Sequence, residues 1–177
     1  MQRAPSTPNA FRLALALVGT VTACPNSPPA VGPDTYDAAA SILLELGTGR
    51  NAFEAVAPVG SSVELVHGPQ GGYHIYGRYR FRGFTPDVYV SFRLTPVEGG
   101  APVNNPADRV RRLDQHGLQR VGEGWEAASP ELVILTTIRG PGEVIGHRFR
   151  WEVFVRSAAT GQVATAERDV TIVDDVP

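Results

Sequence analysis

Period-two alternation is the feature of this sequence that most constrains its fold. In the segment 73–82, aromatic and aliphatic residues recur at every second position, and the segments 88–94 and 148–156 repeat the pattern. Because successive side chains of a β-strand point to opposite faces of the sheet, this alternation predicts half-buried strands. The expected inward residues are Tyr73, Ile75, Gly77, Tyr79, Phe81, Val88, Val90, Phe92, Leu94, Phe149, Trp151, Val153 and Val155.

Shorter apolar runs at 42–46, 63–67, 132–138 and 162–173 predict further strands, with Val170 and Ile172 at the buried end of the last run. Turn-forming dipeptides separate the runs. The number and spacing of strands predict one all-β domain over 37–177, an antiparallel β-sandwich of immunoglobulin-like topology, and a small barrel is the alternative. Two segments stay open. Residues 36–46 suit a strand or a helix, and the long excursion 99–129 suits a short helix or a hairpin.

The first 23 residues have the order of parts of an export signal. Residues 1–12 contain two arginines and no acidic residue, and the apolar run 13–23 is too short to span a bilayer comfortably. The run ends in Val21-Thr22-Ala23-Cys24, an aliphatic residue and two small ones before a cysteine, and this order resembles the lipobox of bacterial lipoproteins. The resemblance implies cleavage before Cys24 and attachment of diacylglycerol to its sulfur. The alternatives are an ordinary secreted protein with a free thiol and an uncleaved signal anchor.

Cys24 is the only cysteine of the chain, which favours the lipoprotein and leaves no partner for a disulfide. Residues 24–36 then comprise the lipidated cysteine and a proline-rich, extended tether. Pro25 stands where lipoproteins retained at the inner membrane of enteric bacteria carry aspartate, so the resemblance favours the outer membrane. The sequence therefore predicts an exported protein whose partner is a membrane, reached through its lipid.

A glycine-rich loop between two predicted strands is the most distinctive string of the chain, and its composition suits a turn with uncovered backbone amides that could cradle an anion or a carbonyl. It resembles a pattern of uncharacterised lipoproteins from high-GC Gram-negative bacteria in which GPQGG-x-H opens a strand, a resemblance that implies no activity. The candidate binding residues are His67, Gly68, Pro69, Gln70, Gly71, Gly72 and His74.

His67 and His74 are the alternative site, because two imidazoles on neighbouring strands are half of a copper or zinc site. Strand register argues against a shared metal. Pairing His67 with Tyr73 sets Leu65 opposite Ile75 and Val63 opposite Gly77, which keeps the apolar face continuous and turns His74 to the other face. The favoured interpretation is a tight hairpin whose histidines are hydrogen-bonded or solvated.

Arginines on the outward side of the alternating segments form a candidate basic face for lipid phosphate or an acidic polysaccharide. The alternative is a solvated face whose arginines are balanced by acids such as Glu152 and Asp87, and the formal net charge of −2 favours it. The same charge argues against a nucleic-acid partner. The residues of this face are Arg78, Arg80 and Arg82, with Arg93, Arg148 and Arg150.

The sequence contains no nucleophile elbow, phosphate-binding loop or zinc-protease motif. We therefore expect no cofactor and no enzymatic activity. The leading hypothesis is a membrane-anchored envelope lipoprotein that acts as a binding module for another envelope protein or a polysaccharide. The competing hypothesis is a periplasmic copper- or zinc-binding protein that uses the glycine-rich loop.

Overall fold

Strands form where the alternation predicts them. The computed structural model describes residues 42–175, apart from the side chains of residues 108–109, so the predicted signal peptide 1–23, Cys24 and the tether 24–36 lie outside the described residues. The long alternating segments are β4 (Tyr73–Arg82), β5 (Val88–Pro96) and β10 (Arg148–Ser157). Their predicted inward residues are buried, except for Tyr73, which is half-buried at the start of β4.

The remaining strands are shorter, apart from the last. They are β1 (Leu43–Thr48), β2 (Glu54–Ala55), β3 (Ser61–His67), β6 (Arg111–Leu113), β7 (Leu118–Val121), β8 (Gly124–Ala127), β9 (Glu131–Ile134) and β11 (Val163–Asp174). The segment that suited a strand or a helix is thus a strand from Leu43 onward. The excursion 99–129 contains both the 3-10 helix η1 (Pro106–Arg109) and the β7–β8 hairpin. A second 3-10 helix, η2 (Pro141–Glu143), precedes β10.

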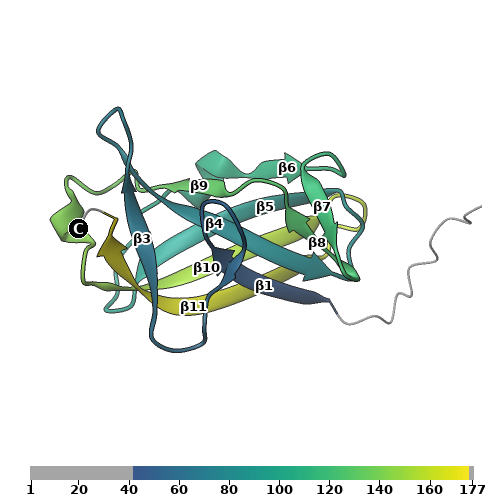
Figure 1. The fold of residues 1–177 in the computed structure, drawn as a ribbon, viewed down its shortest axis with the longest axis horizontal. Coiled ribbons are helices and arrows are strands. Elements are labelled where there is room, and N and C mark those ends of the chain that lie inside the picture. Colours follow the sequence, from purple (N-terminus) through teal and green to yellow (C-terminus); the bar gives the residue numbers. More distant parts are fainter. Residues whose placement is uncertain (1–41, 176–177) are drawn as a thin grey trace, which may run out of the picture. The chain divides into compact units, whose positions relative to one another are not determined.

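The strands form an all-β sandwich of immunoglobulin-like topology, as predicted (Figure 1). In one layer β4 pairs with β1 on one edge and with β8 and β9 on the other. In the other layer the order is β11-β10-β5-β6. These orders correspond to the A-B-E and G-F-C-C′ arrangements of immunoglobulin-like domains. No helix in the range 42–175 is long and apolar enough to cross a bilayer.

One strand departs from the predicted antiparallel pairing. The end of β3 pairs with β4, His67 facing Tyr73 as predicted, but its earlier residues pair in parallel with β11, so that Val63 lies opposite Ile172. The prediction that Val63 lies opposite Gly77 is therefore wrong. The reason is that β4 has no vacant edge at that point, because Gly77 pairs with β9 and the next residue, Arg78, pairs with β1. β3 thus crosses from one layer to the other.

Aromatic rings fill the space between the layers. Ring centroids lie 6.2 Å apart for Tyr79 and Phe81, 6.1 Å for Tyr79 and Phe92, and 6.1 Å for Phe92 and Trp151. Gly77 makes room for this row, because a Cβ atom at that position would lie 2.8 Å from Cζ of Phe92. Since residues 42–175 contain no cysteine, apolar packing and hydrogen bonds hold this sandwich together without a disulfide.

Candidate functional site

The glycine-rich loop closes on itself between β3 and β4. The Gly68 amide donates to the carbonyl of Gly72 at 2.7 Å, and the Gly71 amide donates to the carbonyl of Gly68 at 3.0 Å. Gly71 has a φ of +79°, a conformation that a residue with a Cβ atom adopts only with strain. The loop is thus a tight hairpin in which two of the amides proposed for a cradle already have partners.

His67 and His74 point to opposite faces of this hairpin. His67 pairs with Tyr73 and His74 with Val66, which is the register that the apolar pattern favoured. Each imidazole meets a tyrosine edge-on, with centroids 5.2 Å apart for His67 and Tyr73 and 5.3 Å for His74 and Tyr76. The structure therefore does not bring the two histidines into a common metal site.

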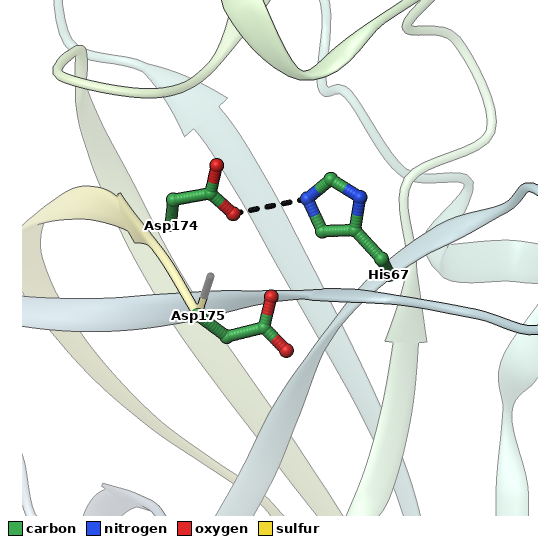
Figure 2. A group of neighbouring side chains, drawn as sticks. All are labelled: His67, Asp174 and Asp175. Carbon is green, nitrogen blue, oxygen red and sulfur yellow. Dashed lines mark hydrogen bonds and ion pairs between the residues drawn. The ribbon is translucent and has the colours of Figure 1, made fainter. Parts of the chain in front are cut away.

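His67 instead lies beside the end of β11. Its Nε2 atom is 3.0 Å from Oδ1 of Asp174, and Asp175 lies beside both residues, as Figure 2 shows. One ligand atom from each of the three side chains lies within 4.8 Å of the others, and all three residues are exposed. One imidazole and two carboxylates are therefore gathered at this end of the sandwich.

Sequence reasoning missed the two aspartates of this cluster. They are more than a hundred residues from His67, and only the parallel pairing of β3 with β11, which places Asp174 opposite Leu65, brings them together. The available signal was the pair of consecutive acidic residues that follows the buried residues Val170 and Ile172. A wholly antiparallel arrangement gave no reason to place that pair beside the loop.

His74 has a different environment. Burial and the nearby Arg50 lower the pKa of His74, while Asp175 opposes the shift. Its buried Nε2 atom has no hydrogen-bond partner in the described part of the chain. The neutral imidazole is therefore the favoured form of His74.

Each arginine of the candidate basic face on β4 lies beside a carboxylate, as the favoured alternative of a balanced surface predicted. Arg78 is buried, with only 3% of its side chain exposed, and its guanidinium lies 3.3 Å from Oε1 of Glu126. The prediction that Arg78 points into solvent is wrong because Glu126, which pairs with Arg80 across the β4–β8 ladder, extends its carboxylate to the Arg78 guanidinium and neutralises its charge. Arg80 shares the same carboxylate at 2.7 Å, and Arg82 lies 3.6 Å from Glu123.

The other three arginines of that face belong to the opposite layer, and each also has a carboxylate partner. Arg93 lies 3.7 Å from Glu152, and both Arg148 and Arg150 lie beside Asp169, at 3.1 and 3.8 Å. Asp87, the other expected counter-charge, pairs with Arg112 at 2.8 Å, and this hydrogen bond lowers the pKa of Asp87. The arrangement is that of a balanced surface.

A cavity of about 490 Å³ opens between the two layers beside β6 and β9. Buried apolar side chains of β5 and β9 form its floor, and an ion pair between Arg111 and Glu131, with contacts of 3.0 and 3.1 Å, lies at its rim. We call this cavity the β6–β9 groove. It is lined by Val90, Phe92, Asn104, Asn105, Val110, Arg111, Thr136 and residues 130–134.

Asn104 shapes one wall of the groove. Its side-chain oxygen accepts from the Leu94 amide at 2.7 Å, and its nitrogen donates to the Phe92 carbonyl at 2.8 Å. A buried side chain thus replaces a neighbouring strand along this part of β5. The segment before η1 is held against β5, and its Val103 carbonyl accepts from the amides of Thr136 and Thr137, just after β9, which joins the two layers at that end of the groove.

The outer edge of β9 borders the groove. Within residues 42–175, the strand that pairs with β9 is β4. The Leu135 amide donates to the Tyr73 carbonyl at 2.9 Å, and in an antiparallel ladder such bonded pairs alternate with pairs whose backbone groups point away. Leu132 and Ile134 therefore direct their amides and carbonyls away from β4. The Tyr76 carbonyl supports this register. Tyr76 lies opposite Leu132, and its carbonyl points to the far side of β4, where it accepts from the Thr48 hydroxyl.

Comparisons with known proteins assign no family to this chain. No family model matches the chain, and no curated protein matches it. A solved structure, the CooA pilin subunit from enterotoxigenic Escherichia coli, is similar with a TM-score of 0.37 and 13% sequence identity, over 74% of this chain and 99% of that chain.

Proposed function

We propose that this protein is an exported lipoprotein, anchored to a membrane through lipid on Cys24, and that its sandwich is a non-enzymatic module that binds another envelope protein. The order of charged region, apolar run and lipobox supports the anchor. Each buried methylene of the attached chains contributes about 0.8 kcal/mol, so more than one acyl chain makes the attachment stable. We place the protein at the outer membrane because Pro25 follows the cysteine.

The β6–β9 groove carries the binding proposal. An extended polypeptide adds to a sheet when a strand presents unpaired backbone groups and nearby pockets accept alternate side chains. Leu132 and Ile134 supply the outward backbone groups, and the apolar floor under β9 supplies the pocket. The occupant that this combination fits is an extended segment with apolar residues at every second position. A polysaccharide has no backbone amides to complete such a ladder.

A proline at position 132 tests this mode of binding. Because the Leu132 amide points away from β4, Leu132→Pro removes a hydrogen bond to an added strand without removing one from the sandwich. Leu132→Ala is the matched control, since it shortens the same side chain but keeps the amide. With a partner protein identified by affinity purification from membranes, we expect Leu132→Pro to weaken binding at least tenfold and Leu132→Ala to weaken it less.

The outcomes are distinct. A partner that binds the wild-type chain and Leu132→Pro equally well would contradict strand addition at β9. If enzymatic digestion of polysaccharide in the complex abolished binding, the partner would be a glycan and not a protein. Circular dichroism of both variants verifies that the sandwich is intact.

The anchor is tested separately, in cells supplied with a labelled fatty acid. We expect the wild-type chain to incorporate label and to sediment with outer-membrane vesicles, whereas Cys24→Ser remains unlabelled. Ser27→Ala, a small change close to the same cysteine, is expected to behave as the wild type does. An unlabelled, water-soluble chain that still carries residues 1–23 would contradict both the lipid anchor and the envelope location.

A further inference from the structure

We propose that His67, Asp174 and Asp175 form a binding site for a first-row divalent transition-metal ion such as Zn²⁺. The His67 Nε2 and Asp174 Oδ1 atoms are 3.0 Å apart, and the three ligand atoms lie within 4.8 Å of one another. Figure 2 shows the three side chains around a common space at the end of β11. The site is independent of the β6–β9 groove.

The backbone places all three ligands. His67 is the last residue of β3 and is paired with Tyr73, while Asp174 is the last residue of β11 and pairs in parallel with Leu65. The Asp175 amide donates to the Leu65 carbonyl at 3.3 Å, which carries the chain on alongside β3. The cluster therefore rests on two hydrogen-bonded strands, so its side chains start from fixed positions.

The distances suit a small cation after side-chain rotation alone. Zinc binds imidazole nitrogen and carboxylate oxygen at about 2.0–2.2 Å, so neighbouring ligand atoms of a tetrahedral site lie about 3.4 Å apart. The His67–Asp174 separation of 3.0 Å is close to this spacing, and the other separations are no more than 4.8 Å. The three groups are thus close enough for side-chain rotation to bring them to a common ion.

The ligand set selects the class of metal. An imidazole nitrogen with two carboxylates suits zinc and its neighbours in the first transition row, whereas calcium and magnesium prefer oxygen ligands alone. The His67 and Asp174 side chains are 38% and 34% exposed, which leaves coordination positions for water. An ion pair between His67 and Asp174 involves only one carboxylate. This cluster contains a second one, from Asp175, as a metal site would need.

Metal titration of the full chain, purified in detergent and stripped of metal, tests the site. We expect isothermal calorimetry to show one equivalent of Zn²⁺ bound, with at least tenfold weaker binding in His67→Ala and in Asp174→Asn. The control is His74→Ala, which removes the histidine on the opposite face of the hairpin and is expected to bind as the wild type does. Ca²⁺ is expected to bind at least tenfold more weakly than Zn²⁺.

A second measurement guards against variants that fold poorly. Zn²⁺ is expected to raise the melting temperature of the wild-type chain and of Leu132→Pro, but not that of His67→Gln. The proposal is overturned if the wild-type chain binds no Zn²⁺, if His67→Ala binds it as well as the wild type, if His74→Ala loses it equally, or if Ca²⁺ binds more tightly. Loss of partner binding in Leu132→Pro with Zn²⁺ uptake retained separates this site from the groove.

Discussion

The guanidinium of Arg78 and the carboxylate of Glu126 form a salt bridge, with Nη1 and Oε1 3.3 Å apart, between side chains that are only 3% and 4% exposed. Arg78 also donates through Nε to the carbonyl of Gly49 at 2.8 Å, so this bridge fastens the turn after β1 to the β7–β8 hairpin. Glu126 additionally accepts from Arg80. The alternation predicted that this face of β4 points into solvent, yet it contains an enclosed pair of opposite charges.

Glu126→Gln is expected to destabilise the domain strongly. It leaves the Arg78 charge buried without its counter-ion, and breaking a buried pair in this way costs about 3–5 kcal/mol. Urea unfolding followed by tryptophan fluorescence measures the change. The matched control is Glu123→Gln, which breaks the exposed pair with Arg82 and is expected to change the free energy of unfolding by less than about 1 kcal/mol. Equal effects of the two variants would contradict the structural role of the buried bridge.

Tyr79→Phe is expected to stabilise the domain. The Tyr79 hydroxyl is buried and has no hydrogen-bond partner in the described part of the chain, and its burial raises the pKa of the phenol well above the ordinary value. An unsatisfied buried polar group costs about 1–3 kcal/mol, so its removal is expected to raise the free energy of unfolding by about 1 kcal/mol. Urea unfolding of both chains provides the measurement. A loss of stability of similar size would mean that the hydroxyl has a partner.

His74 is expected to make the domain less stable in acid. Because its pKa is lowered on folding, the unfolded chain binds a proton more readily than the folded one at pH values below the ordinary histidine pKa of about 6.5. The stability that neutral His74 contributes is therefore fully present above about pH 6.5. It is lost progressively as the pH falls from there toward the lower pKa that His74 has in the folded chain. Urea midpoints at about pH 7.5 and about pH 5 measure the fall. His74→Gln is expected to show a smaller difference between the two, and an unchanged difference would assign the fall to other groups.

Gly77→Ala is expected to disturb the aromatic row. Its Cβ atom would lie 2.8 Å from the Phe92 ring, so the ring or the strand must move, and overpacking of this kind costs about 1–3 kcal/mol. The control is Gly140→Ala, where the new atom meets nothing within 4 Å and the extended φ of −166° suits any residue. Thermal unfolding distinguishes the two. Recovery of stability in Gly77→Ala with Phe92→Leu would identify the ring as the obstacle.

Only part of the candidate site could be predicted from the sequence. Local register predicted from the apolar pattern placed His67 opposite Tyr73 and separated it from His74, because a two-stranded hairpin allows few pairings that keep its apolar face continuous. The neighbours of His67 outside the hairpin depend on which distant strand covers its edge. Asp174 and Asp175 could not be assigned to it without that pairing.

The alternation by itself determined that the domain described by residues 42–175 is built of β-strands and which side chains of the long strands face the core, since a strand with one buried face repeats every two residues whatever its neighbours are. Tertiary structure decided what lies on the outer faces. Arg78 carries the same local pattern as Arg82, yet Arg78 is enclosed by Glu126 and by the backbone carbonyls of the turn after β1, whereas Arg82 lies beside the exposed Glu123. The parallel pairing of β3 with β11 was likewise decided by competition for the edges of β4, and competition between distant segments leaves no periodic trace in the sequence.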